Sequence, residues 1–394
     1  MTKKLRVAMV TPSVEVGGVE TFLLRLGTAL KKFDIEADVI TTELHGEWFD
    51  KVKDAGMVAR HIGGHGVSYP ALHAYRVGHR LATWNYDAIL LNHTPYGQAS
   101  ISLIPDHVPV IPILHSTHDS IFQLASINRL AWNAAVAISP KVLDLARKKI
   151  SRKPIVLIPS AVDAPSEEVF TARIPHQHPF RLIFVGRLSS TKGAFRLPTM
   201  IRQCLDRGLD VTLSLVGDAC ERQYLEKITS DNDVLQRATC HGKLSNGEIY
   251  QLLLQSHALL FPSLFEGLGL VALEAQACGC VPIATRLPGV TDFTIAEGTS
   301  GFLAEADDVN GFVDAIDQLY HDAECWNAMS QAGYTRVLRE FSLAAMSSAY
   351  HQLIMQAIND EYPLFCSRRQ LSPIDSTLFP WGNFEQAFRL WPRT

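Results

Sequence analysis

The chain has 394 residues, of which 47% are hydrophobic and 19% charged, and its formal net charge is −4. A length of this order predicts about two or three domains with ample cores and excludes a small disulfide-stapled scaffold. The composition excludes a disordered acidic tail and a strongly basic nucleic-acid-binding protein, so no nucleic-acid partner is expected.

In the N-terminal part of the chain, short aliphatic runs alternate with amphipathic stretches. The runs predict strands at Leu5–Val10, Ala37–Thr41, Ala88–Leu91, Val108–Leu114, Ala134–Ile138 and Ile155–Ile158. The intervening stretches predict helices at Val19–Lys32, Trp48–Ala55, Ala71–Thr83 and Lys141–Lys149. Continuous apolar strands that alternate with helices predict a parallel sheet covered on both faces.

A polar segment with several prolines, Asp163–Phe180, interrupts this pattern and is predicted to link two domains. A second alternation follows, with strands predicted at Leu182–Val185, Thr212–Val216, Ala258–Phe261 and Val281–Ala284. Its helices are predicted at Phe195–Cys204, Glu221–Thr229, Gly247–Gln255, Leu270–Cys278 and Val309–Tyr320, and a further helix ends near Asn359. Doubly wound sheets bind ligands at the carboxyl ends of their strands, so two of them predict a substrate held between domains.

The seven cysteines all lie in the second half of the chain, at Cys204, Cys220, Cys240, Cys278, Cys280, Cys325 and Cys366. An odd number in this distribution is typical of reduced thiols rather than of a disulfide framework. Cys278 and Cys280 stand in an apolar run without nearby histidines and are predicted to be buried small hydrophobes, not metal ligands. No signal-peptide core and no apolar run of about 18 residues is found, which predicts a cytoplasmic protein.

Two loops that follow strands carry glycines typical of ligand sites. Gly17 and Gly18 precede a helix, where backbone N–H groups and the helix dipole favour anionic or polar oxygen atoms. Their spacing does not fit the G-x-G-x-x-G pattern, which disfavours a nicotinamide cofactor. In the second half, Gly186 is followed by Arg187 and Lys192, two cations that can hold a diphosphate; the alternative is a solvated basic loop.

The segment after the strand Ala258–Phe261 carries the clearest signal. Glu266 precedes Gly267 and Gly269 at the start of a helix, and Glu274 lies within that helix, two turns beyond Glu266. An acid among apolar residues is costly to bury without a partner, and ribose hydroxyls would be suitable partners. The alternative is a cap glutamate followed by a solvent-facing helix glutamate.

These loops resemble the E-x7-E signature and phosphate loop of family-four retaining glycosyltransferases of the GT-B fold. The residues that carry the resemblance are Glu266, Glu274, Gly186-Arg187 and Lys192-Gly193. Three further segments are similar to motifs of that family: Gly17-Gly18-Val19-Glu20, Ile158-Pro159-Ser160-Ala161-Val162-Asp163 and Val216-Gly217-Asp218. The chain departs from the family at Ala161, usually glycine, and at Pro288–Asp292, where G-G-x-x-E is common.

The resemblance implies an α/β protein of two doubly wound, Rossmann-like domains that face each other across a cleft. Residues 1–165 would form the acceptor-side domain and residues 166–345 the nucleotide-sugar-binding domain. Residues 346–394 would form a helix that crosses back to the first domain, followed by a tail with no assigned role.

The resemblance also implies residue roles for a UDP- or GDP-linked sugar donor. Glu274 would bind the ribose, Arg187 and Lys192 the diphosphate, and Glu266 the donor sugar. The implied donor-binding set is Gly17, Gly18, Gly186, Gly267, Leu268, Gly269, Leu270 and Glu274. His118 is expected to face the sugar, with His115 in reserve, so the implied catalytic set is His118, Glu266, Arg187 and Lys192.

No metal and no cofactor are expected, because the two cations and a helix N-terminus can stabilise the departing diphosphate. Asp231-Asn232-Asp233 resembles a metal-binding D-x-D motif but stands in a polar connection, which favours a solvated turn. The acceptor would be a sugar, a glycan or a lipid-linked molecule. The expected reaction is retaining transfer of a hexose-type sugar, in cell-surface glycan or glycolipid assembly.

Other functions stay open. An epimerase or a phosphorylase could use the same architecture, as could a noncatalytic nucleotide-sugar-binding protein. Six basic residues surround one helix end, at Lys141, Arg147, Lys148, Lys149, Arg152 and Lys153. They predict either a solvated face or peripheral contact with the inner face of a membrane.

Overall fold

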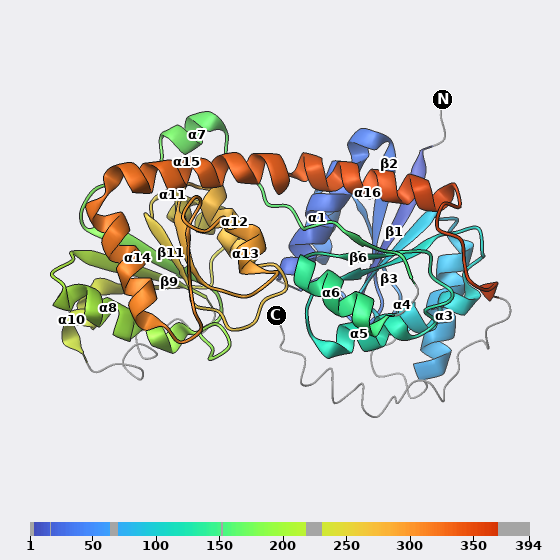
Figure 1. Ribbon diagram of the computed structural model, residues 1–394. Coiled ribbons are helices and arrows are strands. Elements are labelled where there is room, and N and C mark those ends of the chain that lie inside the picture. Colours follow the sequence, from blue (N-terminus) through green and yellow to red (C-terminus); the bar gives the residue numbers. More distant parts are fainter. Residues whose placement is uncertain (1–3, 16, 64–69, 151–152, 218–230, 369–394) are drawn as a thin grey trace. The chain divides into compact units, whose positions relative to one another are not determined.

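The computed structural model describes residues 4–15, 17–63, 70–150, 153–217 and 231–368 (Figure 1). The chain divides into two compact units: unit 1 comprises Met1–Ala161 and Leu343–Thr394, and unit 2 comprises Val162–Ser342. Unit 1 is therefore built from two separate parts of the sequence, whereas unit 2 is continuous.

Unit 1 is built on a seven-stranded sheet with the order β3-β2-β1-β4-β5-β6-β7. All its strand pairs are parallel. The strands are β1 (Leu5–Thr11), β2 (Ile35–Thr41), β3 (Val58–His61), β4 (Ala88–Asn92), β5 (Val110–Leu114), β6 (Ala135–Ala137) and β7 (Ile155–Leu157). The order reverses at β1 and β4, which is where doubly wound sheets place ligands.

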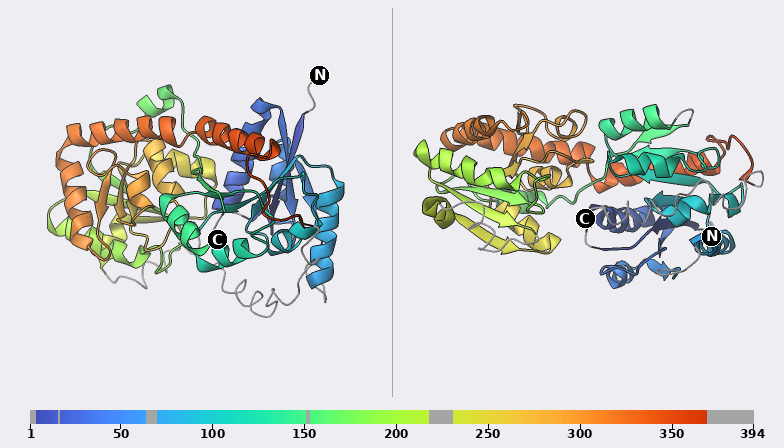
Figure 2. Two further views of the ribbon diagram at one scale, coloured as in Figure 1. Left: turned by 45° about the vertical axis from the view of Figure 1, so that its right-hand side comes forward. Right: turned by 90° about the horizontal axis from the view of Figure 1, so that it is seen from below.

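Helices cover both faces of the unit 1 sheet (Figure 2). They are α1 (Gly18–Leu30), α2 (Phe49–Asp54), α3 (Pro70–Thr83), α4 (Pro95–Ala99), α5 (Asp119–Ser126), α6 (Pro140–Lys149) and α16 (Leu343–Ile358). Helix α6 begins with Ser139 as its N-cap, and the Ser139 side chain accepts from the Val142 N–H. Helix α16 packs against α1 although more than 300 residues separate them in the sequence.

Unit 2 has a six-stranded parallel sheet with the order β10-β9-β8-β11-β12-β13. The strands are β8 (Phe180–Val185), β9 (Val211–Val216), β10 (Ala238–Gly242), β11 (Ala258–Phe261), β12 (Val281–Thr285) and β13 (Phe302–Ala304). Its helices are α7 (Glu167–Thr171), α8 (Leu197–Asp206), α10 (Asn232–Arg237), α11 (Asn246–Leu254), α12 (Leu270–Ala277), α13 (Thr291–Thr294), α14 (Val309–His321) and α15 (Ala323–Glu340). Two apolar clusters of buried residues form its core.

The predicted doubly wound parallel sheets are confirmed, and every predicted strand is present with ends shifted by at most two residues. The predicted helix Glu221–Thr229 lies outside the described residues. Sequence patterns did not reveal the short strands β3, β10 and β13 or the long helix α15. The edge strand β3 is mostly half-exposed, so it lacks the continuous apolar run of a buried strand.

The prediction that Asp163–Phe180 is a linker was wrong, because this segment is packed onto unit 2. Phe170 is buried, and its ring stacks on Tyr334 of α15 with 4.0 Å between centroids. The Ile174 N–H donates to the Leu254 carbonyl, which ties the segment to the end of α11. The segment thus consists of the short helix α7 and irregular stretches around it, and it is held against unit 2.

Candidate active site

Two loops at the carboxyl edge of the unit 2 sheet lie side by side, because β8 and β11 are neighbours. The Leu264 N–H donates to the Thr191 carbonyl across 2.8 Å and joins the two loops. Gly193 makes the close approach possible: its backbone is left-handed, with φ of 69°, and a Cβ atom there would lie 2.2 Å from the Pro262 carbonyl oxygen. Only glycine fits this position without displacement of one loop.

The paired loops bring Lys192 and Glu266 together, 74 residues apart in the sequence. Lys192 Nζ lies 2.5 Å from Glu266 Oε1, and the two side chains are 26% and 12% exposed. A partly buried ion pair of this kind holds both side chains in defined positions. The structure thus unites a cation and a carboxylate that sequence reasoning assigned to one site.

Gly186 and Gly217 form a second close contact, where β8 and β9 end. The Gly186 N–H donates to Val216, and a Cβ atom at Gly217 would lie 1.9 Å from the Gly186 carbonyl oxygen. Arg187 follows directly and is partly buried. The Arg187 backbone is therefore fixed at the carboxyl edge of the unit 2 sheet, beside the loop that carries Lys192.

Helix α12 begins in the same region with an open N-terminus. Its N-cap residue Gly269 has a left-handed backbone, with φ of 84°, and no side chain caps the first N–H groups. Leu268 is buried, whereas Gly267 and Leu270 are partly buried. Uncapped N–H groups and the helix dipole favour a negatively charged ligand here. Glu274 lies one turn further along α12 and is partly buried.

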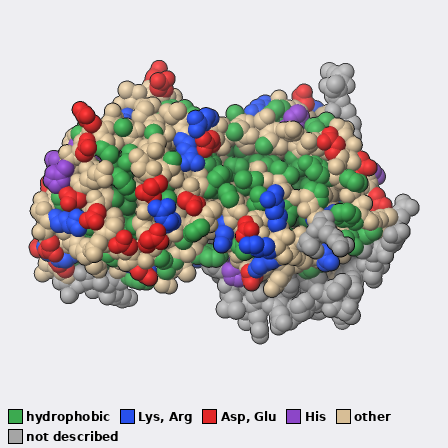
Figure 3. Space-filling model, viewed as in Figure 1, with side chains coloured by type: hydrophobic (Ala, Val, Ile, Leu, Met, Phe, Trp, Pro, Cys, Tyr) green, Lys and Arg blue, Asp and Glu red, His purple; other side chains and the backbone are tan. Residues whose placement is uncertain are grey.

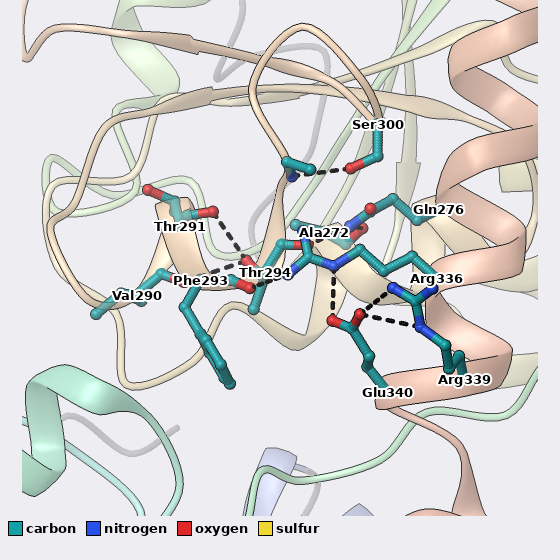
Figure 4. A network of polar contacts seen from close by, with 11 residues as sticks. Ala272, Gln276, Val290, Thr291, Phe293, Thr294, Ser300, Arg336, Arg339 and Glu340 are labelled. Atoms are coloured by element: carbon teal, nitrogen blue, oxygen red, sulfur yellow. Dashed lines mark hydrogen bonds and ion pairs between the residues drawn. The ribbon is translucent and has the colours of Figure 1, made fainter.

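The segment after β12 is held by side chains that sequence reasoning missed (Figure 4). Arg336 of α15 donates to the Phe293 carbonyl across 2.6 Å and pairs with Glu340. Gln276 of α12 donates to the Thr294 carbonyl across 3.0 Å. These contacts anchor the short helix α13, and so they support the loop Pro288–Asp292 that departs from the family pattern.

That loop is closed on itself. The Gly289 N–H donates to Asp292 Oδ1 across 2.7 Å, and the Leu287 N–H donates to Thr291 Oγ1 across 2.7 Å. The Asp292 side chain thus folds back on the loop. No sequence signal indicated the supporting residues, because they come from helices α12 and α15.

In unit 1, Gly17 and Gly18 begin α1 as the sequence predicts. Gly17 is the N-cap and has an extended backbone, and its carbonyl accepts from the Thr21 N–H across 3.1 Å. Glu20, in the first turn, is 8% exposed. Burial raises the pKa of this carboxyl to about 7, with a smaller effect of Glu15 in the same direction.

The two candidate histidines have different environments. His118 is exposed and forms the N-cap of α5, with Nδ1 3.0 Å from Ser120 Oγ. His115 ends β5, and its Nε2 lies 2.9 Å from Asn92 Oδ1. Burial lowers the pKa of His115 to about 3, so its ring is neutral. An oxygen of Asn92 can only accept, so the network assigns the proton of His115 to Nε2.

The segment Asp231-Asn232-Asp233, which resembles a metal-binding D-x-D motif, lies at the start of helix α10. Asp231 accepts from the Asp233 and Val234 N–H groups as the N-cap of α10, and both carboxylates pair with Arg202. Asp231 thus caps the N-terminus of α10, and Asp233 lies in its first turn. Within the part of the chain that the structure describes, no cluster of three or more His, Cys, Asp and Glu residues is placed to hold a metal ion.

The predicted burial of the close cysteine pair is confirmed. Cys278 and Cys280 are at most 1% exposed and pack in the apolar core of unit 2. Burial raises the pKa of both thiols, which makes them poor nucleophiles.

Comparison with protein families gives two matches that together span most of the chain. A model described as glycosyltransferase family 4 matches residues 16–165, and one described as glycosyl transferases group 1 matches residues 167–336. The first match falls in unit 1 and ends just inside unit 2, and the second falls within unit 2.

Curated relatives include a glycogen synthase of Mycobacterium tuberculosis, 27% identical over 52% of this chain and 50% of the relative. The chain therefore matches about half the length of that relative. An uncharacterized glycosyltransferase of Methanocaldococcus jannaschii is 23% identical over 83% of this chain and 90% of its own. Among solved structures, Anabaena HepE in complex with UDP and glucose has a TM-score of 0.73 at 18% identity, covering 89% of this chain and 100% of its own.

Proposed function

The chain belongs to the group 1 glycosyltransferases with the GT-B fold, and from this premise we propose that it moves a hexose-type sugar from a nucleoside-diphosphate donor to an acceptor hydroxyl. The observation that carries the proposal is the junction of the Lys192 and Glu266 loops beside the open N-terminus of α12. This arrangement offers positive charge for a diphosphate and a carboxylate for sugar hydroxyls.

Unit 2 is proposed to hold the donor, which is UDP- or GDP-linked. Arg187, Lys192 and the N–H groups at the start of α12 would bind the diphosphate, and Glu274 the ribose hydroxyls. The HepE structure, which contains UDP and glucose, supports a nucleotide-sugar donor for this fold. Glu266 would contact the donor sugar, since its carboxylate already lies beside Lys192.

We propose transfer with retention of the anomeric configuration. The bond between the anomeric carbon and the diphosphate oxygen breaks, while the acceptor oxygen attacks on the same face of the sugar. An oxygen of the departing diphosphate takes the proton of the acceptor hydroxyl. Arg187, Lys192 and the α12 N-terminus would stabilise the charge that develops on the leaving group, without a metal ion.

For the histidine that contacts the sugar, the geometry favours His115 over His118. Asn92 and the edge of the Phe22 ring hold His115, whereas His118 stands exposed at the N-cap position of α5 and its side chain makes no capping hydrogen bond. A neutral ring with a fixed tautomer offers Nδ1 as a constant hydrogen-bond acceptor for a sugar hydroxyl. We therefore propose His115, the reserve candidate of the sequence analysis, for this role, and the assignment of His118 stays a prediction.

The acceptor is proposed to belong to a cell-surface glycan or glycolipid, which would place the protein in the cytoplasm or at the inner face of a membrane. No helix among the described residues combines the length and apolarity needed to cross a bilayer. On the face shown in Figure 3, Lys and Arg side chains lie beside acidic ones over α6. There Lys148 pairs with Asp144, and Lys149 pairs with Asp119. These ion pairs reduce the positive charge that could attract anionic lipid. The attraction amounts to about 1 kcal/mol for each unpaired cation near the membrane surface.

Lys153 does not belong to that basic face. It is 9% exposed, and its Nζ lies 4.9 Å from the centroid of the Trp132 ring and 4.5 Å from that of Phe365. The predicted cluster of six cations is therefore smaller than the sequence indicates, and Arg152 lies outside the described residues.

The proposal is tested by calorimetric binding of UDP, GDP, ADP and NAD in the presence of EDTA. We expect one nucleoside diphosphate to bind, with affinity reduced by roughly tenfold or more in Arg187→Ala and Glu274→Ala. Arg207→Ala is the matched control, because Arg207 pairs with Asp314 and Asp317 at the other end of α8. Unchanged affinity in both site variants, or preference for NAD, would refute the assignment.

A further inference from the structure

Two consecutive residues at the carboxyl end of β4, Asn92 and His93, both contact His115, which follows β5. Asn92 Oδ1 lies 2.9 Å from His115 Nε2, and the His115 N–H donates to His93 Nε2 across 3.0 Å. The rings of His93 and His115 meet edge to face, with 5.1 Å between their centroids. Two neighbouring residues from another strand thus hold both the side chain and the backbone of His115.

The Asn92 side chain is fixed in one orientation. Asn92 is fully buried, and its Nδ2 donates to the Val10 and Leu90 carbonyls across 3.4 Å each. Because carbonyls only accept, the amide nitrogen faces them and Oδ1 faces His115. His115 Nε2 therefore carries the ring proton, and its Nδ1 presents a lone pair.

His93 has an unusual backbone for a residue with a side chain. Its φ is 50°, in the left-handed region that glycine adopts without strain. Glycine would therefore form this turn at least as well, and the imidazole ring is the part of His93 that the turn does not need. The pairing of β4 with β5 ends at Asn92 and Ile113, so the His115 N–H lies beyond it. There the His93 ring accepts in place of a strand carbonyl.

The same contact defines the state of the His93 ring. Nε2 accepts from the His115 N–H, so it carries no proton and the neutral ring is protonated on Nδ1. Burial lowers the pKa of His93 well below its usual range, and His115 acts in the same direction. Both imidazoles are thus neutral near pH 7, and each nitrogen in these contacts keeps its role as donor or acceptor.

We infer that Asn92 and His93 are positioning residues for His115: Asn92 fixes its ring and tautomer, His93 fixes its backbone, and together they keep Nδ1 in place as the acceptor for a sugar hydroxyl. The inference rests on the proposed glycosyl transfer, in which His115 contacts the donor sugar. His115 is partly exposed, so the two contacts leave part of its ring open to a ligand. Asn92 and His93 act through His115 and need not touch the sugar themselves.

Long-range proton–nitrogen NMR correlation spectra of the full chain with labelled histidine test the contact of Asn92 with the ring. The His115 signals are assigned by their loss in His115→Asn. We expect the wild type to carry the proton on Nε2, and Asn92→Leu to show a mixture of the two tautomers. Asn92→Ala removes the same acceptor and takes the place of Asn92→Leu if the larger side chain prevents folding. An unchanged tautomer would overturn the part of Asn92.

Asn133→Leu is the matched control for this variant. Asn133 is a buried asparagine of the same unit, and its Oδ1 accepts from the Val110 N–H at the amino end of β5. We expect Asn133→Leu to lower the unfolding midpoint and to leave the His115 tautomer unchanged. A loss of stability alone therefore does not produce the expected spectroscopic change.

His93→Gly keeps the left-handed turn and removes the ring, so it tests the contact with the backbone. We expect the His115 amide proton signal to move upfield, because its hydrogen bond to the His93 ring is lost. His93→Gln offers Oε1 in place of Nε2 and should restore most of the effect. Asn85→Gly is the matched control, because Asn85 is exposed, precedes β4 and has a φ of 54°. An amide signal that does not move in His93→Gly would overturn the part of His93.

Calorimetry on the same variants compares UDP and GDP with UDP-glucose, UDP-N-acetylglucosamine and GDP-mannose. We expect Asn92→Leu and His93→Gly to weaken the preferred nucleotide sugar by roughly tenfold. Affinity for the free nucleoside diphosphate should stay at the wild-type value, because the proposed nucleotide-binding residues lie in unit 2. Equal losses for both kinds of ligand, or no loss in either variant, would overturn the inference.

The wild-type titrations separate this inference from the proposed function. A wild type that binds none of these nucleotides would reject the transferase proposal itself. Normal nucleotide binding, together with variants that leave the His115 tautomer and the affinity for nucleotide sugar unchanged, would reject only the roles of Asn92 and His93.

Discussion

Gly193 and Gly208 have the same left-handed backbone but different surroundings, with φ of 69° and 78°. A Cβ atom at Gly193 would collide with the Pro262 carbonyl, whereas one at Gly208 would meet nothing within 4 Å. Gly208→Ala should therefore cost only the backbone strain of about 1 kcal/mol. Gly193→Ala should separate the Lys192 and Glu266 loops and lower nucleotide affinity by more than about tenfold.

Calorimetric titration of both variants with the preferred nucleoside diphosphate checks this prediction. Gly208→Ala controls for the cost of a left-handed alanine, so a difference between the variants reports the loop contact alone. Equal affinities would show that the approach of the two loops is irrelevant to donor binding.

His257 predicts a pH dependence of stability. It is fully buried; the Arg181 N–H donates to its Nδ1 and its Nε2 donates to the Pro175 carbonyl. Burial lowers the pKa of His257 from 6.5 to about 4. Between these values the unfolded chain takes up a proton that the folded protein does not, so this contribution is complete above pH 6.5 and decreases as the pH falls toward 4. It amounts to roughly 3 kcal/mol.

Urea unfolding of His257→Asn between pH 4 and 7 measures this contribution. Asparagine can still accept from the Arg181 N–H, and we expect a lower unfolding free energy at pH 7 together with a shallower pH slope. The exposed His79→Asn on α3 serves as a control. A slope that matched the wild type would assign the acid sensitivity to other groups.

At the scale of elements, the segment after α16 is attached to unit 1 by a buried guanidinium. Arg368 is 1% exposed and donates to four oxygen acceptors within 3.3 Å, those of Pro105, Val108, Ala131 and Asn133. Three of these are backbone carbonyls in the segments that lead into β5 and β6. One side chain thus fixes the C-terminal described segment and two loops at once.

Arg368→Met should destabilise the protein by roughly 3 kcal/mol, because it leaves buried carbonyls without donors. The midpoint of urea unfolding measures the loss, and Arg129→Met, at an exposed position nearby, is the matched control. If the two variants had equal midpoints, the segment would be held by its other contacts, such as Ser367 with Asp106.

At the scale of the whole molecule, two units with separate sheets and cores predict ligand-dependent unfolding in two steps. A nucleoside diphosphate that binds unit 2 stabilises only the state in which that unit is folded. At about 100 times the dissociation constant, the effect is about 2.7 kcal/mol. Scanning calorimetry should therefore show one transition that shifts with nucleotide and one that does not. If nucleotide shifted the whole calorimetric signal to higher temperature as one transition, the two units would unfold together.

The sequence by itself determined the two doubly wound units and most of their strands. Runs such as Ala258–Phe261 are buried on both faces, so every residue in them is apolar and the pattern is visible locally. The helix α15 escaped detection because several of its polar residues, such as Ser330, are buried while Leu338 is exposed. Its apolar stripe is therefore weak, although its packing against α12 is extensive.

Only the tertiary structure decided which residues meet. The pairing of Lys192 with Glu266 depends on β8 lying beside β11, and strand order is not encoded in any local pattern. Neighbours that are distant in the sequence bury Glu20. They also hold Lys153 away from the basic face. Composition and periodicity describe a residue's immediate segment, whereas burial and partnership are properties of the segments that fold against it.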